Sequence, residues 1–363
     1  MRFPEFKGEW EDKKLGDLCS EFKSGKNIKS AEILEDGKFP VFGGNGLRGF
    51  THKYNYNGEY VIVGRQGALC GNVRLVEGKC YMTEHAIVIQ GSEDNNTKFL
   101  LYLLDKLNLG QYSDQSAQPG LAVNKLQKIK VTIPNLSEQN KIASFLFLFD
   151  QRIKTQIKII EDLKVLQNTL IDYYYHHQRY DKNVSLFDCI SQTSERNKKN
   201  NAFPVLSVSN KYGFIQQIEQ FENRKVASED ISNYKIVRKN DFAYNPARIN
   251  VGSIAKLIKY SNGIVSPMYI CFRAKDNFLP DFLEFYFKSK QFKNEVLKRL
   301  EGSVRQCLPF EGLCDIPVVF PPKEKQKDII TQLSAIQTKI EIETTIKELQ
   351  LKQKQHLLHQ MLI

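Results

Sequence analysis

The sequence lacks the features that place a protein in a membrane or on a secretory route. None of its apolar runs reaches the length of a membrane span, since FLFLF at 145–149 is closed off by Asp150. The N-terminus MRFPEFKGEW has no apolar core of the kind that signal peptides carry. The 7 cysteines are an odd number without a CxxC pair, which is typical of reduced, packed thiols. We therefore expect a cytoplasmic protein without membrane contact.

Complete catalytic motifs are also missing. The glycines at 43, 44 and 46 do not form GxGxxG, and the chain has no P-loop. Residues 245–248, NPAR, resemble the Asn-Pro-Pro-aromatic loop of amino methyltransferases, but the second proline and the aromatic residue are absent. Pro280-Asp281 with Glu284 resembles the PD…ExK pattern of nucleases, but no lysine stands two residues after the glutamate, and a helix start explains the same residues.

Two shorter patterns fail in the same way. SEFK (20–23) fits SxxK without the partner motifs SDN and KTG. His356 and His359 have helical spacing, but they have no acidic or cysteine companion. We predict a non-catalytic chain that binds no metal or cofactor of its own.

The positive charge lies in a folded part of the chain. The net charge is +11, and residues 181–322 hold 21 Lys/Arg against 15 Asp/Glu, whereas residues 1–135 hold 18 against 16. Basic residues mixed with amide side chains in a folded region favour a nucleic-acid-binding surface over a nonspecific basic tail. Charge alone leaves open the alternative of an ordinary basic surface in solvent.

A long internal repeat decides the organisation of the chain. IKVTIPNLSEQNKIASFLFLFDQRI (129–153) aligns with IPVVFPPKEKQKDIITQLSAIQTKI (316–340) at a constant offset of 187 residues. Upstream, EYVIVGRQGALCGNV (59–73) resembles NDFAYNPARINVGSI (240–254) more loosely. The repeat predicts globular parts at 1–135 and 181–322 and helices at 136–180 and 323–363.

Both repeated segments predict a long helix. Ser137 can cap the first helix, and neither helix contains Pro or Gly from Ser137 to Gln178 or from Lys323 onward. Roughly 40 residues at about 1.5 Å each give a rod of about 60 Å. Apolar residues recur at 4-3-4 spacing, which predicts that the two helices pack as an antiparallel coiled coil. The residues expected at this interface are Ile142, Leu146, Phe149, Ile153, Ile329, Leu333, Ile336 and Ile340.

The globular parts predict a mixed α+β fold. Strands are expected at 60–64, 85–90, 265–273 and 316–320, where β-branched and aromatic residues lie between Gly, Pro and Asn. Helices are expected at 97–107 and 280–300. The fold class is therefore α+β, with two mixed α/β domains in a tandem pseudo-repeat, separated by two long antiparallel helices.

Loop-rich stretches in both halves combine Lys and Arg with amide and aromatic side chains. Arg pairs bidentately with guanine and Asn or Gln with adenine, while Lys mainly contacts phosphate. Arg65 and Gln66 fall at nearly the same place in the repeat as Asn245 and Arg248. The DNA-binding candidates are Lys26, Asn45, Arg48, Lys53, Tyr54, Arg65, Gln66, Ser116 and Gln118 in the first half, and Asn210, Lys211, Tyr212, Tyr244, Asn245, Arg248, Asn250, Ser303 and Arg305 in the second.

With these motifs in place, nearly the whole chain resembles the specificity subunit of type I restriction–modification systems. The most specific segments are WEDKKLGDL (10–18), FPVFGGNGLRGF (39–50), TEHAIVI (83–89) and IPNLSEQNKIA (133–143). The second helix start, FPPKEKQKDII (320–330), departs from this pattern because Lys325 stands where the first has Glu138. We expect this difference to leave its role unchanged.

The resemblance implies a function and partners. Each half would hold a target recognition domain that binds a half-site of double-stranded DNA, with the helices as spacer. Two modification subunits would bind S-adenosylmethionine and methylate adenine at N6. Restriction subunits that use ATP and Mg²⁺ would join the same complex. Two alternatives are a methyltransferase or nuclease acting alone, which requires a complete motif, and a coiled-coil adaptor that binds DNA without sequence preference.

Overall fold

The computed structural model describes residues 1–67, 69–113, 120–177, 183–199, 202–220, 231–302 and 306–362. The chain forms two compact units. Unit 1 comprises Met1–Lys158 and Thr345–Ile363, and unit 2 comprises Ile159–Thr344. The two long helices, α3 (Leu136–Asp172) and α9 (Lys323–Met361), each contribute residues to both units. Among the described residues, no helix combines the length and the apolar character that crossing a membrane requires.

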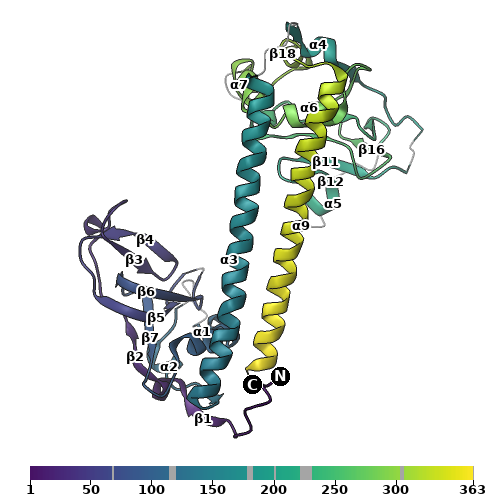
Figure 1. Cartoon of the computed structure of the whole chain (residues 1–363). Helices are drawn as coiled ribbons and strands as arrows, with labels where there is room; N and C mark the ends of the chain where they lie inside the picture. The colour runs from purple at the N-terminus through teal and green to yellow at the C-terminus, as the bar shows by residue number, and fades with distance from the viewer. Residues whose placement is uncertain are drawn as a thin grey trace. The chain divides into compact units, whose positions relative to one another are not determined.

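Unit 1 is built on a six-stranded sheet with the strand order β2-β7-β5-β6-β3-β4 (Figure 1). Its strands are β2 (Cys19–Ser24), β3 (Phe39–Gly43), β4 (Gly46–Thr51), β5 (Tyr56–Gly64), β6 (Val73–Met82) and β7 (Ala86–Gly91). Neighbouring strands are antiparallel except β3 and β6, which pair in parallel. The strands expected at 60–64 and 85–90 fall in β5 and β7. Val61 and Val63 enter one apolar cluster and Ile62 enters another, as the two-residue period of a strand with two buried faces requires.

One face of this sheet packs against helices. The helix expected at 97–107 is α1 (Thr97–Lys106), which Asn96 caps by accepting a hydrogen bond from Phe99 N (2.8 Å). A core cluster joins Phe99 of α1 to Leu146 of α3 and Leu358 of α9. β1 (Glu11–Lys14) pairs with β8 (Lys130–Ile133) ahead of α3. The short helices of unit 1 are α2 (Val123–Leu126) and the 3-10 turns Leu15–Leu18, Ser30–Glu32 and Leu109–Tyr112.

Unit 2 contains two four-stranded sheets, ordered β10-β17-β14-β15 and β12-β11-β16-β13, and the pair β18-β9. Its strands are β9 (Asn183–Ser185), β10 (Ile190–Thr193), β11 (Val205–Ser209), β12 (Gly213–Gln216), β13 (Lys235–Arg238), β14 (Phe242–Tyr244), β15 (Ile254–Lys256), β16 (Asn262–Val265), β17 (Ile270–Ala274) and β18 (Pro317–Val319). The strand expected at 316–320 is β18. The single strand expected at 265–273 is wrong, because a turn closed by Tyr269 N and Ser266 O (3.1 Å) separates β16 from β17.

The helix expected at 280–300 is also divided. It consists of α6 (Pro280–Tyr286) and α7 (Lys290–Lys298). Ser289 is buried and accepts a hydrogen bond from Phe292 N (3.1 Å), so it caps a second helix. The apolar spacing alone predicts a single continuous helix. The other short helices of unit 2 are α4 (Leu186–Cys189), α5 (Gln217–Gln220), α8 (Phe310–Cys314), the 3-10 turn Ile249–Val251 and the π-helix Tyr173–His177 after α3.

A buried glutamine fixes the start of each long helix in the same way. Gln139 accepts a hydrogen bond from Asn96 N (3.0 Å) and donates one to the proline carbonyl five residues earlier (2.9 Å). Gln326 accepts one from Leu279 N (3.0 Å) and donates one to its own preceding proline carbonyl (3.0 Å). Asn96 and Leu279 are the N-cap residues of α1 and α6. Each glutamine therefore ties a long helix to the start of the helix that precedes it in the fold.

The cap of α3 differs from the prediction. The side chain of Asn135, not of Ser137, accepts the hydrogen bond from Glu138 N (3.0 Å), and the helix begins at Leu136. The expectation for Ser137 is therefore wrong by a small shift along the chain, because Asn and Ser both serve as caps and only the backbone geometry selects between them.

Glu138 and Lys325 occupy different environments. Glu138 is buried and forms two hydrogen bonds of 2.7 Å with the Arg2 guanidinium. Lys325 is exposed on the first turn of α9. Phe3 packs edge-on against Phe145 of α3, so the N-terminal segment lies against the first turns of this helix.

Within each unit, α3 and α9 contact each other at matching positions of the repeat. In unit 1, Asp150 forms an ion pair with Lys354 (2.5 Å). In unit 2, Gln167 donates a hydrogen bond to Gln337 (3.0 Å), and these residues lie 187 positions from Lys354 and Asp150. The residues expected at the helix interface that are buried are Ile142, Leu146, Ile153, Ile329, Leu333 and Ile340. Phe149 and Ile336 are partly buried.

Candidate nucleic-acid interface

Several loops of unit 1 meet around residues 83–85, between β6 and β7. Lys26 N, just after β2, donates to Met82 O (3.0 Å), and Thr83 N donates to Phe42 O of β3 (2.9 Å). Arg65 N, just after β5, donates to His85 O (3.0 Å). The ends of β2, β3, β5 and β6 therefore converge, and we call these loops (residues 25–27, 43–46, 64–67 and 83–85) the unit 1 loop cluster.

The close approach of these loops depends on glycine. A Cβ on Gly44 would lie 2.8 Å from His85 O, and a Cβ on Gly64 would lie 2.6 Å from Gly44 O. No other residue fits at these positions without moving the backbone, because real Cβ atoms do not approach carbonyl oxygens this closely. The glycines, whose spacing does not form a cofactor-binding motif, thus allow the loops to pack closely.

Most sequence candidates of the first half lie on this cluster. Lys26, Asn45, Arg48 and Gln66 are exposed, and Arg65 is half-buried. Arg48 joins the cluster through Gly43, since a Cβ added to this glycine would lie 2.7 Å from the Cδ of Arg48. Their guanidinium, amide and ammonium groups are the donor types that contact base edges and phosphates.

Two candidates lie elsewhere. Lys53 and Tyr54 follow β4, beyond the Phe39–Thr51 end of the β3–β4 hairpin, whereas the loop cluster contains its Gly43–Gly46 turn. Lys53 forms an ion pair with Glu32 (2.9 Å), and this hydrogen bond lowers the pKa of Glu32. The structure therefore does not bring Lys53 and Tyr54 to the loop cluster.

Two further residues of the cluster were not predicted from the sequence. His85 Nδ1 lies 3.1 Å from Gln66 Oε1, so the imidazole orients that amide. The Arg74 side chain lies against Gly46, at 3.1 Å from the position of an added Cβ. The segment TEHAIVI contains His85, but the sequence does not indicate that this residue contacts Gln66. Likewise, nothing in the sequence pairs Arg74 in β6 with the turn at Gly46.

In unit 2, the two candidate loops meet directly. Ser253 Oγ donates to Val208 O (3.0 Å), which joins the end of the 245–252 loop to β11. Gly252 lies beside Asn210, with 3.9 Å between its added Cβ and the Cβ of Asn210. Asn210, Lys211 and Tyr212 in the β11–β12 turn therefore lie next to the loop that carries Arg248 and Asn250.

Tyr244 is not part of this surface. Its ring is fully buried, and its hydroxyl donates to Leu308 O (3.1 Å), so the prediction that it contacts DNA is wrong. Burial raises the pKa of this hydroxyl. Asn245 is also largely buried, and its side chain accepts a hydrogen bond from Ala247 N (3.1 Å), which assigns it to the turn. Arg248 and Asn250 are exposed. Ser116, Gln118, Ser303 and Arg305 lie outside the described residues.

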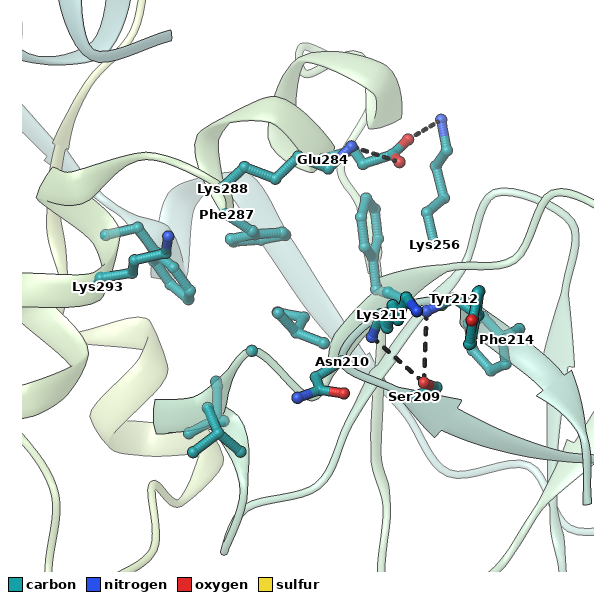
Figure 2. A pocket seen from close by; sticks show the side chains of 18 of the residues that line it. Ser209, Asn210, Lys211, Tyr212, Phe214, Lys256, Glu284, Phe287, Lys288 and Lys293 are labelled. Atoms are coloured by element: carbon teal, nitrogen blue, oxygen red, sulfur yellow. Dashed lines mark hydrogen bonds and ion pairs between the residues drawn. The ribbon is translucent and has the colours of Figure 1, made fainter. Parts of the chain in front are cut away.

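A cavity of about 830 Å³ opens beside the unit 2 loops (Figure 2). Figure 2 shows Asn210 and Lys211 on the turn at one side, and Phe287 and Lys293 at the other. Its wall includes α3 through Gln167 and Ile171, so the cavity lies between the β11–β12 turn, α7 and the end of α3.

The two acids of α6 that resemble a nuclease motif pair with a lysine of β15, and Glu284 and this lysine line the cavity. Lys256 of β15 is buried and pairs with both Asp281 and Glu284, the latter at 2.9 Å. Lys288 pairs with the second oxygen of Glu284 (3.3 Å). The ammonium group of Lys256 thus pairs with both carboxylates, and together with Lys288 it balances their charge. Among the described residues, no group of three or more His, Cys, Asp or Glu side chains is arranged to hold a metal ion.

Comparison with known proteins identifies relatives of one kind. Over 154 residues the chain is 40% identical to the EcoprrI type I restriction enzyme specificity subunit of Escherichia coli, a match covering 41% of this chain and 38% of that protein. It is 23% identical to the MjaVIII specificity subunit of Methanocaldococcus jannaschii, over 96% of this chain and 90% of that protein. The chain spans little more than a third of the length of the Escherichia coli relative in that match.

Solved structures show the same fold. The S subunit of a type I restriction–modification system from M. genitalium superposes with a TM-score of 0.67 at 15% identity, covering 100% of this chain and 99% of the other. A chain from a structure of type I complex assembly gives a TM-score of 0.57 at 15% identity, covering 98% of both chains. The family model for the type I restriction modification DNA specificity domain matches residues 7–164 and 188–352. This chain therefore belongs to the type I restriction–modification DNA specificity domain family.

Proposed function

We propose that this chain is the non-catalytic subunit that recognises DNA in a type I restriction–modification complex, and that it binds an asymmetric bipartite site. The observation that carries the proposal is the pair of matched helix starts, where Gln139 and Gln326 each hold the N-cap of α1 or α6. The two units that share this framework expose different loops with basic and amide side chains. Equivalent frameworks with different loops suit two half-sites of different sequence.

The long helices act as the spacer in this proposal. Helix-to-helix contacts occur in both units, through Asp150 with Lys354 and through Gln167 with Gln337. A paired α3 and α9 would set the number of unread base pairs between the half-sites. The chain itself would carry no catalytic group, cofactor or metal.

Partner subunits supply the chemistry. Two modification subunits would bind S-adenosylmethionine and transfer its methyl group to adenine N6, one at each half-site. Restriction subunits with ATP and Mg²⁺ would complete the complex. An outer apolar stripe on each helix, Ile159 and Leu166 on α3 and Ile342 and Leu349 on α9, supports docking of partner helices. The residues of each pair are seven positions apart, which is the spacing of a helix seam. Their side chains are 39–59% exposed, so this seam is open to a partner helix.

The test is to coexpress the chain with its modification subunit and map N6-methyladenine across the host genome. Methylation at one motif of two unlike blocks around a fixed gap is the expected result. An assembled complex whose methylation does not depend on this chain would refute the proposal. Binding of every duplex with equal affinity would instead identify a coiled-coil adaptor without sequence preference.

A further inference from the structure

The cavity of unit 2 has an excess of positive charge. Its charged lining consists of five lysines and one glutamate (Lys211, Lys256, Lys259, Lys288, Lys293 and Glu284). Lys256 and Lys288 are neutralised by Glu284 and the neighbouring Asp281. Lys211, Lys259 and Lys293 form no ion pair with any described residue. Three ammonium groups therefore line this cavity without a carboxylate partner in the part of the chain that the structure describes.

The rest of the lining includes apolar and amide groups. Phe287 and Phe292 form apolar parts of the wall, and Asn210 and Asn250 lie on the loop side. A sugar–phosphate strand has the complementary character, because apolar deoxyribose alternates with anionic phosphate. Lysine neutralises phosphate as a flexible point charge and carries little base specificity. Its apolar stem can also lie along apolar surface while the ammonium stays in water.

Unit 1 has a smaller cavity of about 400 Å³, which is lined by β6, α1, α3 and α9. Its charged residues are balanced, because Arg74 and Lys354 lie with Asp105 and Asp150. Lys354 is paired with Asp150 (2.5 Å). Of these two cavities, the one in unit 2 thus has the uncompensated charge, as judged from the described residues.

We propose that the unit 2 cavity holds the DNA backbone beside the half-site of unit 2, with Lys211, Lys259 and Lys293 neutralising phosphates. This inference rests on the proposed function, and it adds a sequence-independent contact between unit 2 and the phosphate backbone. The loops with Asn210, Arg248 and Asn250 would then contact base edges at the rim, while the cavity holds the strand in register.

The experiment measures affinity over a range of salt concentrations with Lys211→Gln, Lys259→Gln and Lys293→Gln. The full chain, assembled with its modification subunit, is titrated with a duplex of its mapped methylation motif and with a mixed-sequence duplex. Each substitution is expected to weaken binding of both duplexes by the same factor, and to reduce the slope of log affinity against log salt by about 0.9. Lys293→Arg keeps the charge and should keep the slope.

The matched control is Lys239→Gln, which removes an exposed lysine of unit 2 that does not line the cavity. If the cavity variants show the same affinity and salt dependence as Lys239→Gln, the inference is overturned. The proposed function still stands in that case, provided that the unaltered complex prefers its motif. Variants that lose the modification subunit instead of DNA affinity also overturn it, because the cavity would then hold an acidic partner surface. Equal affinity of the unaltered complex for both duplexes would refute the proposed function itself.

Discussion

Arg65 and Gln66 follow β5, and their counterparts Asn245 and Arg248 follow β14, but the four side chains have different surroundings. Gln66 is oriented by His85, and Asn245 is occupied by its own turn. The sequence predicts the loops at these positions because glycine, amide and basic residues gather there. It does not predict the direction of each side chain, which the packing of neighbouring loops decides.

At the residue scale, Arg65→Ala is expected to relax one half-site of the methylated motif and leave the other unchanged. Loss of one bidentate base contact costs about 1–3 kcal/mol of discrimination. Methylation mapping on the coexpressed complex measures the change. Tyr244→Phe is the matched control in the other unit, since it removes a buried hydrogen bond to Leu308 O and should leave the motif as it is. If Arg65→Ala relaxes recognition at both half-sites, the assignment of Arg65 to one half-site is contradicted.

Helices are the elements that the sequence predicts best. The 4-3-4 apolar spacing and the absence of Pro and Gly locate α3 and α9 to within a few residues. The break between α6 and α7 escapes prediction because a single buried serine, Ser289, creates it without altering the apolar pattern. The same limit applies to the sheets, since strand order depends on long-range pairing that no local pattern encodes.

At the element scale, Gln139→Ala and Gln326→Ala are expected to destabilise their own units by similar amounts. Each substitution removes the side-chain partner of a partly buried N–H and of a buried carbonyl, which costs about 2 kcal/mol. Denaturant unfolding of the full chain measures the loss. Gln151→Ala, at an exposed position of α3, is the control with little effect expected. A large effect in one unit and none in the other would show that the two helix starts are not equivalent.

The outer stripe of α3 supplies a second prediction at this scale. Leu166→Glu is expected to weaken copurification of the modification subunit, because a carboxylate would be buried in the apolar seam. Val165→Glu, at a neighbouring position that is 64% exposed on another face of the helix, is the control. Equal loss of the partner in both variants would point to a change in the helix itself and against the stripe as the docking face.

For the whole molecule, the proposed spacer makes a geometric prediction. One heptad inserted after Lys158 and another after Thr344 leaves the residues of both units intact. Each heptad adds about 10 Å of helix, which corresponds to about three base pairs of duplex. Methylation mapping should then report the same two half-sites with a wider gap. Altered half-sites around the original gap would argue against the helices as a spacer.

Unit 1 is assembled from two separate stretches of chain, and unit 2 from one. Truncation after Thr344 removes Leu357, Leu358, Met361 and Leu362 from the core of unit 1. We expect this truncation to lower the stability of unit 1 and to leave unit 2 folded. Limited proteolysis followed by mass spectrometry should show early cleavage within residues 1–158. Equal cleavage of both units would indicate that they unfold together.

The discontinuity of unit 1 also sets an order on biosynthesis. The ribosome makes residues 1–158 before unit 2, yet the apolar residues of their core at 357–362 are made only after unit 2. Unit 2 is complete in the nascent chain before that point. Of the two units, the one whose translation begins earlier is therefore completed later, and it exposes its unfinished core to chaperones and proteases throughout translation of unit 2.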